Sequence, residues 1–317
     1  MDIINSLLHV SALEKIMHQH FGIKDSKCHL LRSHRNDVYE IASFGKKYIL
    51  KIFSTSKQKE EIVFEIKYSV FLNGKGVMVN TPVSTTDNDK YITLDFPEGK
   101  RCAILFDYNN GLELDYKKSC NAFFYGKNVA KLHLASKDYK PSLTNEIDIF
   151  QQFFDATNML EIFFNTYKNE HWTYFDNFFK KLICKIKTID TKKMPIGYIH
   201  GDLHGGNSLV NGKELFFYDF EYSGLGLICY ELSVFRWSTL IGNREPQWEL
   251  FLNGYRSLIS ISDCELRYSL LMVCVRDVLI LANTVNITDK FGISSMHNYY
   301  IHNRLEFMKK MINILQI

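Results

Sequence analysis

This 317-residue sequence has few prolines and little net charge. Five prolines leave little room for a proline-rich linker between domains. The formal net charge is only +3, and lysine and arginine are spread along the chain without a dense basic block. A charge this small does not favour a nucleic acid or an anionic membrane as a partner. We therefore expect neither.

Cysteine is poorly placed for cross-linking or for metal binding. The seven cysteines are far apart and form no C-x-x-C pair, so we expect no disulfide framework and no zinc site. The first residues lack the basic stretch and apolar run of a signal peptide. The longest apolar run, Leu270 to Val275, is too short to span a bilayer and ends at Arg276. These absences predict a cytoplasmic protein.

Hydrophobic residues make up 46% of the chain, which is enough for a sizeable core. Up to about Phe106 the pattern is rich in strands, with one helix. After residue 111 the pattern is mostly helical. The expected strands are 28–32, 38–43, 46–53, 91–94 and 101–106, and the expected helices are 57–72, 117–136, 150–187 and much of the chain after 229.

The third expected strand carries a lysine between apolar residues. Lys51 shares one strand face with Ile49 and Phe53, and we expect that face to be covered. A buried lysine is costly unless it is paired. Glu65, on the following expected helix, is the natural partner. A surface ion pair is the alternative, and the alternating strand pattern argues against it.

The strongest signal is the stretch from Tyr198 to Asn207, which is followed by Asp219. Its spacing, His-x-Asp-x-x-x-x-Asn, is that of the catalytic loop of kinases. In this interpretation Asp202 takes the proton of an acceptor hydroxyl. Asn207 and Asp219 offer the hard oxygen ligands that Mg²⁺ prefers. The pattern therefore predicts phosphoryl transfer.

A hairpin is expected directly after this loop. Asn211-Gly212 is a strong turn signal between two short strands, 208–210 and 215–218. Such a hairpin would carry Asn207 and Asp219 back toward each other.

The motif His-Gly-Asp-x-His-x-x-Asn followed by Asp-Phe-Glu resembles the aminoglycoside phosphotransferase and choline kinase-like family, from about Leu31 to Trp237. The resemblance implies an α+β, two-lobed, protein-kinase-like fold. Residues 1–106 would form an antiparallel-sheet lobe that binds nucleotide, and residues 107–317 a mostly helical lobe with the catalytic and substrate-binding residues. It also implies ATP-dependent, Mg²⁺-assisted transfer of the γ-phosphoryl group to a hydroxyl of a small molecule. Aminoglycosides, amino alcohols and hydroxy amino acids are the expected acceptors.

The same resemblance assigns residues to the nucleotide. Asn36 resembles the asparagine of the family's first hairpin. Lys51, aimed by Glu65, would hold the phosphates. Phe106 and Tyr108 resemble the hinge whose backbone holds adenine.

Two positions depart from the family pattern. The nucleotide loop, residues 33–36, has no glycine, so the side-chain charge of His34 or Arg35 could take over phosphate contact. Glu231 stands where the family has aspartate, usually as a structural brace. We expect a packing change there rather than lost activity.

Other polar residues of the motif have less specific roles. We expect His200 to orient the loop by hydrogen bonding, and His204 to support the loop or contact the substrate. Glu221 would contact metal, the amine of a substrate, or only solvent.

Alternative functions stay open at the level of sequence. One is a protein Ser/Thr kinase of the same fold, and another is an inactive, nucleotide-binding pseudokinase. A third is a metal-dependent hydrolase with His200, Asp202 and His204 as ligands. The identity of the acceptor, the choice between ATP and GTP, and the oligomeric state are open. Acidic residues of the C-terminal helices line either a cation site or a solvated face; they are Glu245, Glu249, Asp263, Glu265 and Asp277.

Overall fold

The structure is a computed structural model that describes residues 3–115, 118–168, 170–190 and 193–316. Its internal contacts divide the chain into two compact units. The first unit comprises Met1–Glu113, Tyr139–Leu143 and Ser208–Glu221, and the second comprises Leu114–Asp138, Thr144–Asn207 and Tyr222–Ile317. The expected single boundary after residue 106 stays a prediction about domains. The division by contacts differs from this single boundary chiefly because it groups residues 208–221 with the N-terminal part of the chain.

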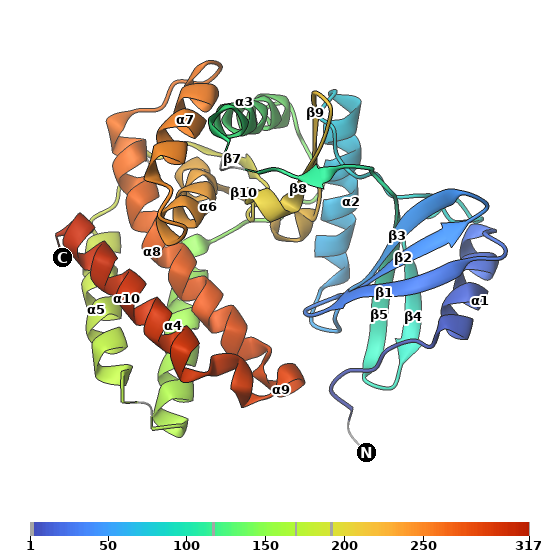
Figure 1. The fold of residues 1–317 in the computed structure, drawn as a ribbon, viewed down its shortest axis with the longest axis horizontal. Coiled ribbons are helices and arrows are strands. Elements are labelled where there is room, and N and C mark those ends of the chain that lie inside the picture. The colour runs from blue at the N-terminus through green and yellow to red at the C-terminus, as the bar shows by residue number, and fades with distance from the viewer. Residues whose placement is uncertain (1–2, 116–117, 169, 191–192, 317) are drawn as a thin grey trace. The chain divides into compact units, whose positions relative to one another are not determined.

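The first unit is built on a five-stranded antiparallel sheet with the order β1-β2-β3-β5-β4 (Figure 1). Every strand expected before residue 107 is present. The strands are β1 (Lys27–Ser33), β2 (Asp37–Ser43), β3 (Lys46–Ile52), β4 (Ile92–Phe96) and β5 (Gly99–Asp107). The central position of β3 follows from its alternation, since both of its faces carry apolar residues that need cover.

One helix lies on each face of this sheet (Figure 1). Helix α1 (Val10–Phe21), which the sequence pattern did not predict, buries Met17 against the face that carries Leu50. Helix α2 (Lys59–Gly74), close to its predicted bounds, packs on the face that carries Phe53. The predicted division of β3 into two faces is confirmed, and Lys51 lies on the α2 side.

The hairpin expected after the motif is also present. Strands β8 (Ser208–Asn211) and β9 (Glu214–Phe217) pair antiparallel, and the two-residue β6 (Leu112–Glu113) pairs with β8. Gly212 in the turn has φ +61°, a conformation that glycine adopts without strain. The amide of Phe217 donates to the main-chain oxygen of Met78 at 2.9 Å. This bond anchors the end of the hairpin in the first unit.

The second unit is mostly helical, with one short sheet in which β7 (Ile196–Ile199) pairs with β10 (Gly224–Leu227). The stretch predicted as helical over 150–187 is two helices, and the predicted start at Lys117 lies outside the described residues. The helices are α3 (Ser119–Ser136), α4 (Ile149–Thr166), α5 (Trp172–Ile186), α6 (Ile228–Ile241), α7 (Glu245–Arg256), α8 (Asp263–Asn286), α9 (Thr288–Phe291) and α10 (Asn298–Leu315). Short 3₁₀ helices are η2 (Gly205–Asn207), η3 (Phe220–Tyr222) and η4 (Ile293–Met296).

Helix α8 is the one described helix that is long and apolar enough to cross a membrane by length and composition. Its Met272 and Val273 are fully buried in the main hydrophobic core of the second unit. It also carries two charged residues in its middle, Arg276 and Asp277, both in ion pairs. A core helix passes the same composition test, so this helix does not argue for a membrane span.

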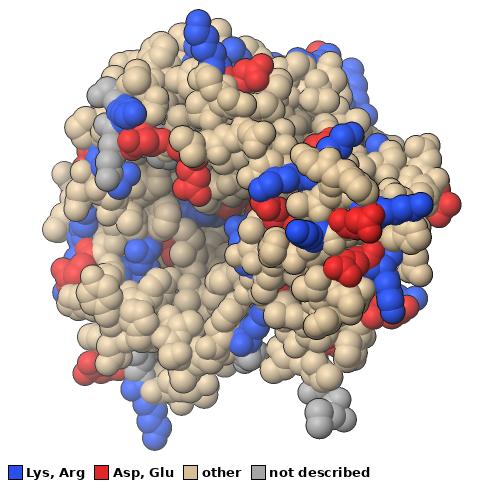
Figure 2. Space-filling view, turned by 45° about the vertical axis from the view of Figure 1, so that its right-hand side comes forward, with Lys and Arg blue, Asp and Glu red and all other residues tan. Residues whose placement is uncertain are grey.

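Charges of both signs are mixed on the molecular surface. On the face shown in Figure 2, lysine and arginine side chains lie close to aspartate and glutamate side chains, and no large area carries one sign. This agrees with the small net charge. The absence of nucleic-acid and membrane partners, like the cytoplasmic location, stays a prediction.

Candidate active site

A cavity of about 300 Å³ lies within the first unit. Apolar side chains form much of its wall, among them Val38 from β2, Ile49 from β3 and Phe106 from β5. Charged side chains lie in the same wall, including Lys51 and Asp219. A wall of this kind suits a ligand with a flat apolar part and an anionic part.

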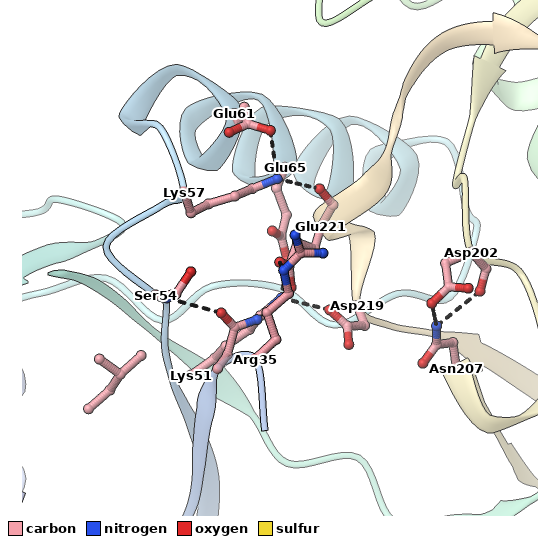
Figure 3. Close-up of polar contacts among 12 residues, drawn as sticks. Arg35, Lys51, Ser54, Lys57, Glu61, Glu65, Asp202, Asn207, Asp219 and Glu221 are labelled. Atoms are coloured by element: carbon pink, nitrogen blue, oxygen red, sulfur yellow. Dashed lines mark hydrogen bonds and ion pairs between the residues drawn. The ribbon is translucent and has the colours of Figure 1, made fainter. Parts of the chain in front are cut away.

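Lys51 is the centre of a buried charge cluster. Its Nζ lies 2.6 Å from Asp219 Oδ1, 3.4 Å from Glu65 Oε1 and 3.3 Å from Glu221 Oε2 (Figure 3). Only 6% of the lysine side chain is exposed. The surface ion pair considered from the sequence is therefore wrong. The structure brings Lys51, Glu65, Asp219 and Glu221 together in one unit.

The charges in this cluster shift one another's pKa values. Burial alone would lower the pKa of Lys51, but the carboxylates of Asp219, Glu65 and Glu221 more than offset it and hold that pKa above its usual value. Burial raises the pKa of Glu65 to about 7, against the attraction of Lys51. The lysine therefore stays charged at neutral pH, whereas Glu65 is poised between its two protonation states.

Asp219 is held in an uncommon backbone conformation. Its φ is +67°, in the left-handed region that aspartate tolerates better than most residues. Its Oδ2 lies 3.1 Å from the guanidinium of Arg32 on β1. Arg32, which the sequence did not single out, lies in the cavity wall. That His34 or Arg35 could contact phosphate stays a prediction.

A bulge in β1 explains why Arg32 reaches the cavity. The register of β1 against β2 shifts between Leu30 and Arg32. Strict alternation would put Leu31 and Arg32 on opposite faces, but both line the cavity because the bulge rotates the strand.

Glu221 is bound by the loop that lacks glycine. Asn36 Nδ2 donates to Glu221 Oε2, and Asn36 Oδ1 accepts from the amide of Ser54. Arg35 lies 4.0 Å from the other Glu221 oxygen, and Lys57 donates to its main-chain oxygen at 2.7 Å (Figure 3). Glu221 is thus buried among protein groups and does not face only solvent. The nucleotide role of Asn36 stays a prediction.

The expected adenine segment also borders the cavity. Phe106 and Tyr108 are both in its wall, at the end of β5. Asn80 and Asn109 are joined there by a side-chain hydrogen bond, and neither was expected from the sequence. These groups give the apolar end of the cavity a polar edge.

In the second unit, the catalytic-loop motif follows β7 and begins with a tightly packed glycine. Gly201 has φ +81°, and a Cβ added to it would lie 2.2 Å from the main-chain oxygen of Tyr222. Its amide donates to Glu231 Oε2 at 2.8 Å. Glu231 is buried, and burial raises its pKa to about 8. Its position matches the structural brace expected from the sequence.

Asp202 is surrounded by donors. Asn207 Nδ2 lies 3.1 Å from Asp202 Oδ2 and also donates to the main-chain oxygen of Asp202 (Figure 3). The guanidinium of Arg276, on α8, forms an ion pair with Asp202 Oδ1. Burial would raise the pKa of Asp202, but Arg276 and His204 outweigh it and hold that pKa well below its usual range. This carboxylate stays ionised.

The two histidines of the motif face the loop itself. His200 is fully buried, and the amide of Asp202 lies 3.4 Å from its Nδ1. His204 Nδ1 accepts from the amide of Gly206 at 3.0 Å, and its Nε2 lies 3.6 Å from Asp202. Within the described part of the chain, no three His, Cys, Asp or Glu side chains form a metal-binding group. The geometry therefore does not favour the hydrolase alternative.

Arg276 is a further residue near the motif that sequence reasoning missed. It is 74 residues from Asp202 in the chain, so no local spacing connects the two. One signal was available, because Arg276 is the charge that ends the longest apolar run. A charged residue in the middle of a buried helix needs a partner.

The acidic residues of the C-terminal helices do not gather into a cation site. Asp277 pairs with Arg304 and accepts from Trp237 Nε1, and Glu245 pairs with Lys310. Glu265 caps the start of α8. These residues are therefore better described as scattered structural and solvated groups than as a cation site.

Solved structures of similar architecture show the fold of this chain. An amicoumacin kinase in complex with AMP-PNP, Ca²⁺ and Ami matches with a TM-score of 0.77 over 96% of this chain and 94% of that chain, at 18% identity. A microcompartment-associated aminopropanol kinase matches with a TM-score of 0.71 over 97% of each chain, at 16% identity. The predicted protein-kinase-like α+β fold is confirmed.

The family follows from the sequence match. Residues 28–258 match the phosphotransferase enzyme family, and the chain belongs to it. An uncharacterized protein from Deinococcus radiodurans is 23% identical over 96% of this chain and 90% of its own length. The resemblance drawn from the catalytic-loop motif is confirmed at the level of the family.

Proposed function

We propose that this chain transfers the γ-phosphoryl group of ATP to a hydroxyl group of a small molecule. The observation that carries the proposal is the buried Lys51, which lies among Asp219, Glu65 and Glu221 in the wall of a cavity that also presents a large apolar surface. A charged lysine held in such a wall is suited to bind the phosphates of a nucleotide. Of the similar structures, the amicoumacin kinase contains the ATP analogue AMP-PNP.

The nucleotide would use the first unit. Val38, Ile49 and Phe106 would cover the adenine, and Lys51 would neutralise the phosphates. Because Glu65 and Asp219 already bind Lys51, its ammonium group is oriented before the nucleotide arrives. Little reorganisation is then needed on binding.

The donor set fits Mg²⁺ as the cofactor. Asp219, in the first unit, offers a carboxylate oxygen of the kind that Mg²⁺ prefers. Asn207, in the second unit, offers its Oδ1, because its Nδ2 is occupied by Asp202. When bound, Mg²⁺ would neutralise phosphate charge that builds up during transfer. Arg32 and Lys51 hold the Asp219 carboxylate in place.

The acceptor would use the second unit, with Asp202 as the residue that receives its hydroxyl. The acceptor oxygen forms a bond to the γ-phosphorus while the bond to the β,γ-bridging oxygen breaks and ADP leaves. The hydroxyl proton passes to Asp202 and then to solvent. Since the pKa of Asp202 is low, its main contribution is to orient the hydroxyl rather than to remove the proton early.

The test combines turnover and nucleotide binding in Asp202→Asn. ATP consumption is measured over aminoglycosides, amino alcohols, hydroxy amino acids and a protein substrate, and ADP binding is measured by calorimetry. We expect the wild type to turn over a small hydroxyl compound, and D202N to lose about a thousandfold in kcat with unchanged ADP affinity. Full turnover by D202N would sink the mechanism, phosphorylation of the protein substrate alone would favour the protein-kinase alternative, and nucleotide binding without any turnover would favour the pseudokinase.

A further inference from the structure

A second cavity, of about 350 Å³, lies within the second unit beside the loop that carries Asp202. Its lining comes from that loop, through His204, and from α6 and α8. Arg244 and Gln247, at the beginning of α7, complete it. One of its lining residues, Arg276, contacts Asp202 directly.

The charge in this cavity is positive. Two guanidinium groups, Arg244 and Arg276, are among its lining residues, and none of the described lining residues is aspartate or glutamate. The charge of Arg276 is balanced by Asp202. Arg244 has no ion-pair partner among the described residues, and its hydrogen bonds are made by its main chain. One cationic group is therefore left uncompensated in a concave, partly apolar site.

One acidic residue beside the lining is already committed to other groups. Asp277 follows Arg276 on α8, but it is 1% exposed and pairs with Arg304. It also accepts from Trp237 Nε1 at 2.9 Å, which fixes the indole ring that lines the cavity. A bound amine would need a carboxylate to compensate its charge, and this lining supplies none.

The remaining lining groups suit a small polar molecule. Ser238, Thr239 and Gln247 present hydroxyl and amide groups, and Trp237 and Ile280 present apolar surface. Neutral groups of this kind bind hydroxyls, whereas a guanidinium group binds carboxylate or phosphate by two parallel hydrogen bonds.

Building on the proposed function, we propose that this cavity binds the acceptor and that Arg244 recognises an anionic group on it. The hydroxyl of the acceptor lies at Asp202, and its carboxylate or phosphate lies at Arg244. Arg276 is a positioning residue that holds Asp202. The acceptor is then a hydroxyl compound that carries a carboxylate or phosphate, such as a hydroxy acid, or a zwitterionic hydroxy amino acid whose own carboxylate balances its ammonium, and not a cationic amino alcohol or aminoglycoside.

Matched acceptors test this assignment on the full-length protein. Glycerate, glycerol 3-phosphate and glycerol differ only in the anionic group, and homoserine and 3-amino-1-propanol form a second pair with and without carboxylate. We measure kcat and KM with Mg²⁺ and ATP, and equilibrium binding by calorimetry without ATP. The anionic members should bind about ten- to a hundredfold more tightly than the others, as expected for one charge-assisted contact. The glycerate and glycerol 3-phosphate arms separate carboxylate from phosphate recognition.

Arg244→Gln should remove most of that preference, mainly through KM. Arg244→Lys keeps the charge and should retain part of it, which separates loss of charge from loss of folding. Arg256→Gln is the matched control, since Arg256 is an exposed arginine at the other end of α7. A preference for amines or neutral acceptors, or an equal loss by R244Q for charged and neutral compounds, would overturn the proposal. If no acceptor is turned over, the proposed function fails, but calorimetry still tests the cavity assignment. Binding that is selective for anionic groups and depends on Arg244 supports the assignment. The absence of such binding overturns it.

Discussion

The two units each bury an ion-paired cluster, and the clusters balance charge in opposite ways. In the first unit a single lysine, Lys51, lies within 3.4 Å of Glu65, Asp219 and Glu221. In the second unit a single carboxylate, Asp202, lies among Arg276, His204 and Asn207. Excess carboxylate surrounds the cation in the first cluster, and excess donors surround the carboxylate in the second.

The difference appears directly in the pKa values of the carboxyl groups. Burial raises the pKa of Glu65 to about 7, whereas Arg276 and His204 outweigh burial and lower the pKa of Asp202. Burial opposes ionisation in both places, although the side chain of Glu65 is 4% exposed and that of Asp202 is 17% exposed. Two of the three groups that share the first cluster with Glu65 are carboxylates, whereas Arg276 beside Asp202 is a cation, so the sign of the neighbouring charges adds to the difference. The first cluster can exchange a proton near neutral pH, and the second keeps a fixed negative charge.

The largest effects should come from removing the central charge of the first cluster. Lys51→Met leaves three carboxylates without their common cation, so we expect ADP affinity to fall at least about tenfold and kcat/KM about a hundred- to a thousandfold. Lys47→Met is the matched control on the same strand, since Lys47 is exposed and pairs with Glu40. Calorimetry and a coupled ATPase assay measure the two quantities.

This experiment also distinguishes the clusters. D202N should lose turnover with ADP affinity unchanged, and K51M should lose both. If D202N weakens ADP binding as strongly as K51M, the assignment of nucleotide to one cluster and acceptor to the other is wrong.

A backbone substitution tests how rigidly the second cluster is built. Gly201→Ala combines a left-handed φ of +81° with a Cβ 2.2 Å from the oxygen of Tyr222. We expect a loss of about 3 kcal/mol or more in the free energy of unfolding, measured by urea denaturation. Gly212→Ala is the control, because φ is +61° but nothing lies within 4 Å of the new Cβ, so the loss should be only about 1 kcal/mol. Equal losses of unfolding free energy in the two variants would show that the close approach of Tyr222 does not restrict the residue at position 201.

Local patterns were sufficient to predict much of the first unit. The alternation of β3 predicted the covered face of Lys51, and helical spacing put Glu65 on the next element. The turn signal at Asn211-Gly212 predicted the β8–β9 hairpin that bears Asp219. In each case the information lies within a few residues of the feature, because strand and turn geometry are set locally.

The rest depends on contacts between distant segments. The Asp202–Arg276 pair joins a loop to a helix 74 residues later, and no periodicity encodes that meeting. The approach of Arg32 to Asp219 depends on a bulge in β1, which shifts the strand register by a local irregularity that the residue pattern does not reveal. These contacts could be identified only from the folded structure.

The pH dependence of stability provides a smaller test of the first cluster. The pKa of Glu65 is raised from 4.5 to about 7 on folding, so the native state holds a proton that the unfolded state has lost. The stability that this proton contributes is complete below pH 4.5 and is lost as the pH rises to about 7. Between pH 5 and 8, the wild type should therefore lose about 2 kcal/mol relative to Glu65→Gln.

Urea denaturation of both proteins without nucleotide or metal ion measures that difference. Other titrating groups are shared by the two proteins and cancel in the comparison. If the free energy of unfolding depends on pH in the same way for the wild type and E65Q across this range, Glu65 titrates normally. The first cluster then carries no excess of negative charge.

The smallest effect should come from Arg32, the exposed member of the first cluster. Its side chain is 56% exposed, although its guanidinium lies 3.1 Å from Asp219. Water and salt screen such a pair, so Arg32→Gln should weaken ADP binding only about twofold at physiological salt, and less at 0.5 M salt. Calorimetry at two salt concentrations measures the affinity of wild type and R32Q for ADP. A loss as large as that of K51M, unaffected by salt, would mean that Arg32 binds phosphate directly and replaces the contacts that a glycine loop makes.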